Sequence, residues 1–339
     1  MSYRVLELFS GAGGLALGLK QAGWNHVAAV EMDPIAATTF RQNIPNCNVM
    51  VENIRDINFS KFNMSIDLVA GGPPCQPFSV AGHQKASDDA RDCVPDFIRV
   101  VGQVQPQMFL MENVAGLAMA RHRAYLRNVL TRLEKLGFIV RHEVLDAADF
   151  GVPQHRKRLI IVGTKHIPFS FSAIRKASKF VPARAVLSEF PPDQENRAIV
   201  TYAKNPVMRP SPFAGMMVNG GGRPINLDAP CQTIPASAGG NRTHIVDWNG
   251  VLIRYHDRLL SGGMPLKGNV KGVRRLSVRE SARLQTFPDT FDFFGTHSAQ
   301  YRQIGNAVPP QLGKSIGEAL LKMLDNPSEF VQMDDTLGL

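Results

Sequence analysis

A proline-rich turn at residues 71–79 holds the side chain best suited to chemistry in this chain, the thiol of Cys75. The turn follows an apolar run at residues 66–70 that has the character of a buried strand. Prolines on both sides of Cys75 fix the backbone dihedral φ, so the thiol is lifted off the end of the strand in a defined position. A thiol held in this way is placed for nucleophilic attack.

A carboxylate follows a later apolar run. Glu112 comes directly after residues 108–111 and precedes Asn113 and Val114. The carboxyl ends of parallel strands meet at one edge of a sheet, where ligands bind, so Glu112 and Cys75 are expected on the same rim. Taken singly, a buried cysteine is usually inert packing and a Glu-Asn pair is often a helix cap. The prolines and the shared rim together favour catalysis over these structural interpretations.

A glycine-rich loop ends the first apolar run, where residues 9–14 read Phe-Ser-Gly-Ala-Gly-Gly. Glycines there let the backbone approach a ligand closely. Glu31 ends the second run, where a carboxylate can hydrogen-bond the ribose of an adenosine cofactor. The loop departs from the GxGxxG spacing because Ala16 occupies the sixth position. These two elements alone favour a nicotinamide enzyme and an S-adenosylmethionine enzyme equally.

The elements that must position these residues alternate along the first half of the chain. Apolar runs separated by helical patterns predict an α/β fold, in which a parallel sheet is covered by helices on both faces. The runs expected as strands are residues 5–9, 27–30, 66–70, 108–111, 138–140 and 159–162. A stripe of apolar residues predicts a helix from Tyr125 to Leu136, with Gly137 placed to end it.

The middle of the chain, residues 168–275, has a different composition. It is rich in proline and glycine, no helix longer than a turn or two is expected, and its apolar residues suffice for a small, loop-rich, mostly β domain. Residues 171–275 contain 15 lysines and arginines against 6 acidic residues, whereas the rest of the chain is balanced and the net charge is +9. Such a surplus is typical of a surface that faces a polyanion, and a solvated basic face is the alternative.

Helical order returns near the end of the chain. Ser277 and Glu280 form a capping-box pattern, and a final helix is expected at residues 312–324. The predicted divisions are therefore residues 1–167, residues 168–275, and a returning segment at residues 276–339 that completes the first domain.

Cysteine usage and hydropathy exclude several classes of protein. The four cysteines form no CxxC pair and no cluster with histidine, which argues against a disulfide framework and against a zinc site. No apolar run approaches the roughly 20 residues that span a bilayer, and the first residues do not resemble a signal peptide. We therefore expect a soluble, cytoplasmic protein with no metal and no membrane partner.

Eight blocks in order give the chain a resemblance to the DNA (cytosine-5)-methyltransferases of bacterial restriction-modification systems. The blocks are residues 9–14, Glu31, Asp56, and residues 71–79, 112–114, 154–158, 275–288 and 303–309. The resemblance implies a Rossmann-like methyltransferase sheet that uses S-adenosylmethionine and releases S-adenosylhomocysteine. It makes residues 168–275 the target-recognition domain and double-stranded DNA the partner. It further implies a monomer, with a cognate restriction endonuclease acting on the same site without direct contact.

The chemistry that the resemblance implies begins with Cys75. Carbon C5 of cytosine is a poor nucleophile, so a thiolate must first add at C6 to give an enamine with an electron-rich C5. The resemblance places Glu112 at N3 and Arg158 at O2, with Arg156 as the other catalytic arginine of its block. Attack at C6 is perpendicular to the ring, so the base must be flipped out of the duplex. Residues 79–87 have the composition of a loop that closes over it.

The remaining site residues are also assigned through the resemblance. Cofactor contacts are expected from Phe9, Gly11, Gly13, Gly14, Glu31, Met32, Asp56, Ile57, Pro74 and Asn306. Met32 departs from the family, in which an aromatic residue commonly follows the acid, so a somewhat weaker cofactor affinity is expected. DNA contacts are expected from Gln76, Ser79, Arg91, Thr233, Gly239, Gly240, Asn241 and Arg242. Arg242 could bind guanine bidentately or contact a phosphate.

Three other functions compete with this one. An RNA (tRNA) cytosine-5 methyltransferase would share the chemistry, but the long basic segment favours DNA. A catalytically inactive DNA-binding protein is disfavoured because Cys75, Glu112, Arg156 and Arg158 are all present. A nicotinamide dehydrogenase would need a hydride-transfer site, which the sequence does not offer. The recognised DNA sequence does not follow from the residues.

Overall fold

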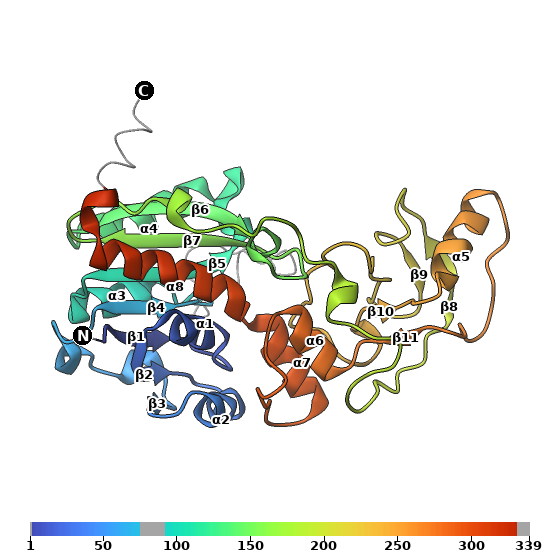
Figure 1. The fold of residues 1–339 in the computed structure, drawn as a ribbon, viewed down its shortest axis with the longest axis horizontal. Coiled ribbons are helices and arrows are strands. Elements are labelled where there is room, and N and C mark those ends of the chain that lie inside the picture. Colours follow the sequence, from blue (N-terminus) through green and yellow to red (C-terminus); the bar gives the residue numbers. More distant parts are fainter. Residues whose placement is uncertain (1, 75–91, 331–339) are drawn as a thin grey trace. The chain divides into compact units, whose positions relative to one another are not determined.

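The computed structural model describes residues 2–74 and 92–330. The chain forms two compact units (Figure 1). The sheet unit consists of Met1–Phe150, Lys157–Ala177 and Val308–Leu339, and the second unit consists of Gly151–Arg156 and Ser178–Ala307. In the part of the chain that the structure describes, no helix is long and apolar enough to cross a membrane.

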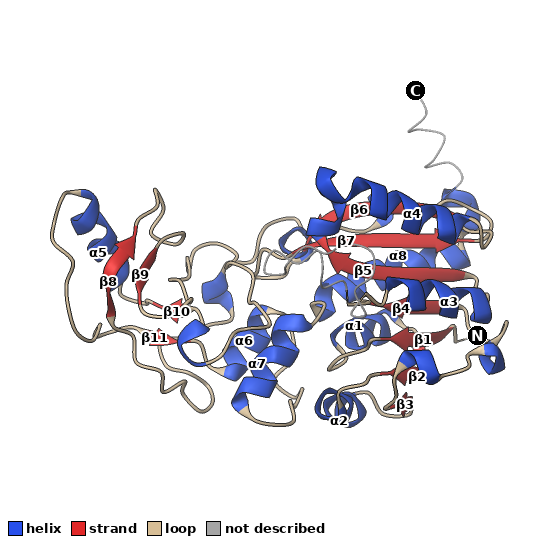
Figure 2. Ribbon diagram, turned by 180° about the vertical axis from the view of Figure 1, so that it is seen from behind, coloured by secondary structure: helices blue, strands red, loops and turns tan. Residues whose placement is uncertain are grey.

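A seven-stranded sheet forms the centre of the sheet unit (Figure 2). Its strands lie in the order β3-β2-β1-β4-β5-β7-β6. Their bounds are β1 Arg4–Leu8, β2 Asn25–Val30, β3 Asn48–Met50, β4 Leu68–Gly71, β5 Met108–Val114, β6 Ile139–Asp146 and β7 Lys157–Thr164. The parallel register pairs Leu8 with Val30 and Gly71, and Gly71 with Met111, so the carboxyl ends of β2, β1, β4 and β5 are aligned.

The sheet departs from the sequence prediction in two ways. The predicted sheet with helices on both faces is confirmed, but it is not parallel throughout, because β7 runs antiparallel to both β5 and β6. Antiparallel neighbours need no crossover helix, and only the short 3-10 helix η6, Ala147–Phe150, lies between β6 and β7. The sequence also gave no sign of β3, which has three residues at the edge of the sheet.

Helices cover both faces of the sheet. They are α1 Gly14–Ala22, α2 Pro34–Asn43, α3 Val94–Val104, α4 Arg123–Glu134 and α8 Pro310–Asp325. One face packs Leu6, Val69 and Phe109 against residues of α3 and α4, and the other packs Ala29 against α1 and α2. The predicted helix ending before Gly137 is confirmed as α4, and the predicted final helix is confirmed as α8.

Helix α8 returns from the far end of the chain to lie beside α1 (Figure 1). The two helices touch at glycines: a Cβ on Gly18 would lie 2.3 Å from the Pro310 carbonyl oxygen. Beyond the crossing, Trp24 Nε1 donates a hydrogen bond to the Gly317 carbonyl at 3.0 Å. Helix α1 follows the glycine-rich loop directly, so this packing fixes the direction in which the loop leaves the sheet.

The second unit contains short strands, loops and three helices. Strands β8 Tyr202–Val207 and β9 Met216–Val218 pair antiparallel, as do β10 Ile245–Val246 and β11 Arg274–Arg275. The helices are α5 Val251–Leu260, α6 Val278–Leu284 and α7 His297–Asn306. The capping box of Ser277 and Glu280 is confirmed at the start of α6. The expectation that residues 168–275 contain no sizeable helix is wrong, because α5 buries Leu252 and Tyr255 in the core of this unit.

Short 3-10 helices complete the two units. They are η1 Ile54–Asp56, η2 Ser60–Phe62, η4 Ala115–Ala118, η5 Ala120–His122, η6, η7 Phe171–Ala173, η8 Ala183–Ala185 and η9 Gly240–Arg242.

Candidate active site

An ion pair joins two strands at the edge of the sheet unit. Arg158 Nε lies 2.7 Å from Glu112 Oε1, and the two side chains are 14% and 13% exposed. The antiparallel register places Arg158 opposite Val114, so Glu112 and Arg158 are diagonal neighbours on one face. Arg158 Nη1 also donates to the Lys157 carbonyl at 2.8 Å. The guanidinium is thereby held against one oxygen of the carboxylate.

The end of β4 forms a wall beside this pair. Asn113 is buried, and its Nδ2 donates to the Pro73 carbonyl at 3.0 Å. A Cβ on Gly72 would lie 2.7 Å from Glu112 Oε2, and a Cβ on Gly71 would lie 2.2 Å from the Leu8 carbonyl oxygen. The two glycines therefore let β4 approach both neighbours closely. Glu112 Oε1 faces Arg158, while Oε2 lies on the Gly72 side.

Four predicted site residues fall outside the described residues: Cys75, Gln76, Ser79 and Arg91. The expected closing loop, residues 79–87, lies there too. The described backbone leads up to this segment through Pro73 and the exposed Pro74, and resumes at Asp92. The backbone N–H of Cys93 donates to the Pro74 carbonyl at 3.0 Å, which fixes the two ends of the segment side by side.

The glycine-rich loop adopts a conformation that side chains normally oppose. Gly11 has φ +54° and Gly13 has φ +94°, and Gly13 caps α1, which begins at Gly14. Phe9 has φ +54° although it is not glycine. Such a left-handed backbone costs of order 1–3 kcal/mol at a bulky residue, and strain of this kind clusters at ligand sites. A Cβ on Gly13 would meet the Phe40 ring at 2.9 Å.

Glu31 is tied to this loop by its carboxylate. Its Oε2 accepts a hydrogen bond from the Gly11 backbone N–H at 2.7 Å, and its Oε1 accepts one from the Asp33 N–H at 2.8 Å. Burial raises the pKa of Glu31, and these two hydrogen bonds oppose that rise without cancelling it. Met32, the next residue, is 69% exposed. A fixed acceptor beside an open loop and an exposed thioether fits the ribose and the base of an adenosine cofactor.

Two further predicted cofactor residues of the sheet unit follow β3. Asp56 is exposed at the end of η1, which is capped by the side chain of Asn53, and Ile57 is buried in the core. The predicted cofactor residue Asn306 belongs to the second unit, where it is exposed at the end of α7.

The two arginines of residues 154–158 have different partners. Arg158 pairs with Glu112 in the sheet unit, whereas Arg156 is 1% exposed and lies in the second unit. Arg156 donates from Nη2 to the Gly305 carbonyl at 2.7 Å and from Nη1 to the Ile234 carbonyl at 3.3 Å. These two hydrogen bonds tie the Arg156 guanidinium to the backbone at Ile234 and Gly305.

The same segment holds the start of the predicted recognition loop. Gln154 Oε1 accepts from the Ile234 N–H at 3.2 Å, and Thr233 Oγ1 donates to the His155 carbonyl at 2.6 Å. Farther along, Gly239 has φ +137° and Gly240 has φ +48°. Asn241 and Arg242 follow in η9 with both side chains exposed.

Two residues that support this loop had no predicted role. Arg275 is fully buried, and its Nη1 donates to the Thr243 carbonyl at 2.8 Å. The side-chain nitrogen of Asn196 donates a hydrogen bond to the Gly240 carbonyl of this loop, although Asn196 lies 44 residues earlier in the sequence. The sequence did mark Arg275 as the first residue of the block 275–288 that carries the resemblance, although without a role. No local pattern marks Asn196.

Comparison with known proteins extends over nearly the whole chain. Residues 3–322 match the family model for C-5 cytosine-specific DNA methylase. Type II methyltransferase M1.HphI of Haemophilus parahaemolyticus is 36% identical over 345 residues, which cover 96% of this chain and 88% of that protein. Type II methyltransferase M.NgoMIV of Neisseria gonorrhoeae is 33% identical and covers 96% and 99% of the two chains.

Solved structures share the fold at lower identity. A triple mutant of DNMT2 from Spodoptera frugiperda superposes with a TM-score of 0.70 at 18% identity, covering 94% of this chain and 100% of that one. S. pombe Dnmt2 gives 0.69 at 18% identity, covering 96% and 100%.

Proposed function

Because the chain belongs to the C-5 cytosine-specific DNA methylase family, we propose that the sheet edge formed by β4, β5 and β7 carries the family's reaction. In that reaction C5 of cytosine in DNA is methylated, with S-adenosylmethionine as the methyl donor. The observation that carries this proposal is the Glu112–Arg158 ion pair, 2.7 Å long, beside the glycine-proline segment that leads to Cys75. An RNA substrate is not favoured, since the matched family is described as a DNA methylase and the curated relatives are Type II methyltransferases.

Cys75 is the nucleophile of this proposal. Once Cys75 has given its thiol proton to water, the thiolate sulfur forms a bond to C6 of cytosine, and the electrons of the C5–C6 double bond shift so that C5 becomes electron-rich. Glu112 takes up a proton from water on Oε2, the oxygen on the Gly72 side, and passes it to N3, while Arg158 holds Oε1. When bound, S-adenosylmethionine would supply the methyl group that the electron-rich C5 takes up, and it would leave as S-adenosylhomocysteine. Loss of the C5 proton to water, return of the N3 proton to Glu112 and release of the Cys75 sulfur restore the aromatic ring.

Arg158 has a second part in this proposal. It fixes the orientation of the Glu112 carboxylate, and its guanidinium carries further N–H donors of the kind needed at O2, where negative charge develops. The cytosine must leave the stack for C6 to be reached, so the duplex is bound with one base flipped.

The residues around the glycine-rich loop hold the methyl donor in this proposal. Glu31 binds the ribose hydroxyls as an acceptor, and the carboxylate is already oriented by the Gly11 and Asp33 N–H groups. The backbone of Phe9, Gly11, Gly13 and Gly14 lies along the donor, and Met32 covers the adenine. Asp56, Ile57, Pro74 and Asn306 complete the set.

We infer that residues 168–275 recognise duplex DNA, with residues 1–167 and 276–339 forming the catalytic part. The basic surplus of residues 171–275 supports this assignment, as do the exposed Asn241 and Arg242 and the neighbouring Thr233, Gly239 and Gly240. The relatives are Type II methyltransferases, so a cognate endonuclease that cuts the unmethylated site is the expected companion.

The test is transfer of tritium from labelled S-adenosylmethionine into duplex DNA of mixed sequence. The wild type should label the DNA and form a covalent adduct with duplexes that contain 5-fluorocytosine. Cys75→Ser should abolish both signals, because the serine hydroxyl is a far weaker nucleophile at neutral pH.

Cys47→Ser serves as the matched control, since burial raises the pKa of the Cys47 thiol to about 12 and keeps it unreactive. Cys47→Ser should keep both signals. Labelling by Cys75→Ser would contradict the assignment of the nucleophile, and no labelling by the wild type would contradict the function.

A further inference from the structure

The exposed recognition residues stand on a small turn, Gly239–Thr243, here called the recognition turn. Hydrogen bonds close it: the Gly239 N–H donates to Thr243 Oγ1 at 3.0 Å, and the Arg242 N–H donates to the Gly239 carbonyl at 3.0 Å. Thr243 is buried at one end, while the side chains of Asn241 and Arg242 are exposed. The conformation of the turn therefore sets where these two side chains lie.

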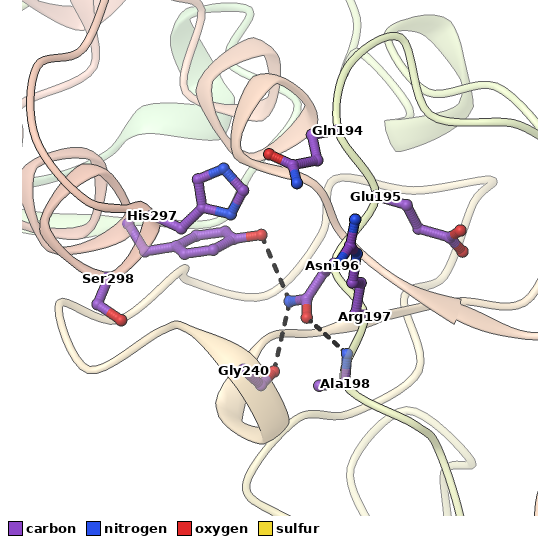
Figure 3. Close-up of a pocket in the computed structure, with 9 residues that line it drawn as sticks. Gln194, Glu195, Asn196, Arg197, Ala198, Gly240, His297 and Ser298 are labelled. Atoms are coloured by element: carbon purple, nitrogen blue, oxygen red, sulfur yellow. Dashed lines mark hydrogen bonds between the residues drawn. The ribbon is translucent and has the colours of Figure 1, made fainter.

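Asn196 reaches this turn from a distant segment of the second unit (Figure 3). Its Nδ2 lies 3.2 Å from Thr243 Oγ1 and 3.4 Å from the Gly240 carbonyl oxygen. The same nitrogen lies 3.4 Å from the Tyr301 hydroxyl and 3.5 Å from the Leu276 carbonyl oxygen. Two amide protons are thus shared among four oxygens, two of them in the recognition turn. The Tyr301 hydroxyl itself donates to the Leu276 carbonyl at 2.8 Å.

The other end of the Asn196 side chain makes a local bond. Its Oδ1 accepts from the Ala198 N–H at 3.1 Å, which fixes the side chain to its own backbone. The amide is therefore oriented before it meets the turn, so that Nδ2 and not Oδ1 faces Gly240 and Thr243.

Packing does not hold the Gly240 side of the turn. A cavity of about 290 Å³ opens there, lined by Asn196, Arg197, Gly240, His297, Ser298 and Tyr301 among others (Figure 3). A Cβ on Gly240 would meet no atom within 4 Å. On the opposite side the turn is packed, because the Asn241 carbonyl would lie 1.9 Å from a Cβ on Gly220. On the cavity side the turn thus relies on hydrogen bonds for its position.

We propose that Asn196 is a positioning residue for sequence discrimination, whose amide locks the recognition turn so that Asn241 and Arg242 meet the DNA in one arrangement. This inference rests on the proposed function of residues 168–275 and deepens it. Loss of the amide donors leaves the turn free to shift into the cavity, so cognate and near-cognate sites are distinguished less well. The chemistry at Glu112 and Arg158 is not touched by the change.

The test is Asn196→Asp, which keeps the oxygen that binds Ala198 and replaces the donating nitrogen with an oxygen that cannot donate. The DNA sequence that the wild-type enzyme methylates is first identified by bisulfite sequencing of a methylated plasmid. Then kcat and KM are measured on the cognate duplex and on duplexes with one changed base pair. We expect kcat on the cognate duplex to stay within about twofold, KM for DNA to rise, and the cognate to near-cognate ratio of kcat/KM to fall about tenfold, the factor that corresponds to one hydrogen bond.

Asn226→Asp is the matched control, because Asn226 Oδ1 makes the same local bond, to the Asp228 N–H at 3.0 Å. It should keep the wild-type ratio. An unchanged ratio in Asn196→Asp, or a loss of activity that is equal on every duplex, would overturn the inference while leaving the proposed function in place. A wild type that methylates no duplex would instead overturn the proposed function.

Discussion

Gly72 shows how one missing side chain leaves room for the carboxylate of Glu112, which we propose to be catalytic. Arg158 fixes one oxygen of Glu112, and the other oxygen occupies the space that a Cβ on residue 72 would need. Any larger residue at this position would push the carboxylate away from the rim of the sheet. The atom in conflict is the end of a flexible side chain, so the fold can absorb the change even though the active site cannot.

We therefore expect Gly72→Ala to lower kcat about 100-fold, the cost typical of a misplacement of about 1 Å in a catalytic group. The melting temperature and the affinity for S-adenosylmethionine should stay near wild type. Single-turnover methylation and thermal melting measure the two effects. Gly102→Ala is the control, since its Cβ in helix α3 would meet only Leu136 methyl groups, at 3.3 Å and beyond. Full activity in Gly72→Ala would show that the position of Oε2 is unimportant.

The sequence predicted those parts of the site in which the residue type alone dictates the chemistry. The position of Glu112 after an apolar run predicted that it lies on the rim of the sheet. The same reasoning placed the glycine-rich loop and Glu31 there, and the hydrogen bond from the Gly11 N–H to Glu31 brings the loop and the carboxylate together. The different partners of Arg156 and Arg158 could not be foreseen, because two arginines two positions apart look alike until the chain passes from one unit to the other. The part of Asn196 depends on contacts between remote segments.

At the scale of elements, the crossing of α1 and α8 is the contact that aligns the glycine-rich loop. A Cβ on Gly18 would clash with backbone atoms of Pro310, Gly313 and Lys314, at distances from 2.3 to 2.8 Å. Backbone atoms cannot swing aside as a side chain can. The helices must separate if residue 18 carries a methyl group.

Gly18→Ala should accordingly lower the free energy of unfolding by about 1–3 kcal/mol, the usual cost of overpacking, despite the better helix propensity of alanine. Urea denaturation measures this cost, and S-adenosylmethionine affinity should fall with it because the loop shifts. Lys20→Ala, an exposed change on the same helix, should be close to neutral. A Gly18→Ala protein as stable as the wild type would mean that the helices are not in close contact.

The elements that sequence patterns missed have identifiable causes. Strand β3 is too short for a periodic signal, and the direction of β7 is set by its partners and not by its own residues. Helix α5 did carry a signal, since Leu252, Tyr255 and Leu259 recur at helical spacing. The proline and glycine content of its surroundings concealed it.

At the scale of the whole molecule, charge is divided unequally along the chain. Residues 171–275 hold an excess of basic side chains, while the remainder is balanced. Binding that depends on these residues releases counterions from DNA, whereas binding at the glycine-rich loop does not.

DNA affinity should thus fall at least a hundredfold between about 50 and 200 mM salt, as expected for several phosphate contacts. S-adenosylmethionine affinity should change little over the same range, which provides an internal control in the same samples. Fluorescence anisotropy with a labelled duplex and calorimetry with the cofactor give the two profiles. A flat DNA profile would show that the basic segment faces solvent and not a phosphate backbone.

The packing of α1 against α8 also constrains the order in which the protein folds during its synthesis. Trp24 and its partner Gly317 are 293 residues apart, so a ribosome that adds about 5–20 residues per second delivers the second about 15–60 seconds after the first. During that interval Leu15 and Leu19, which are buried in the finished protein, lack their contacts with Gly313 and Gly317 of α8. The nascent chain consequently exposes apolar side chains that favour aggregation. Chaperones that bind nascent polypeptides should therefore act on it before translation ends.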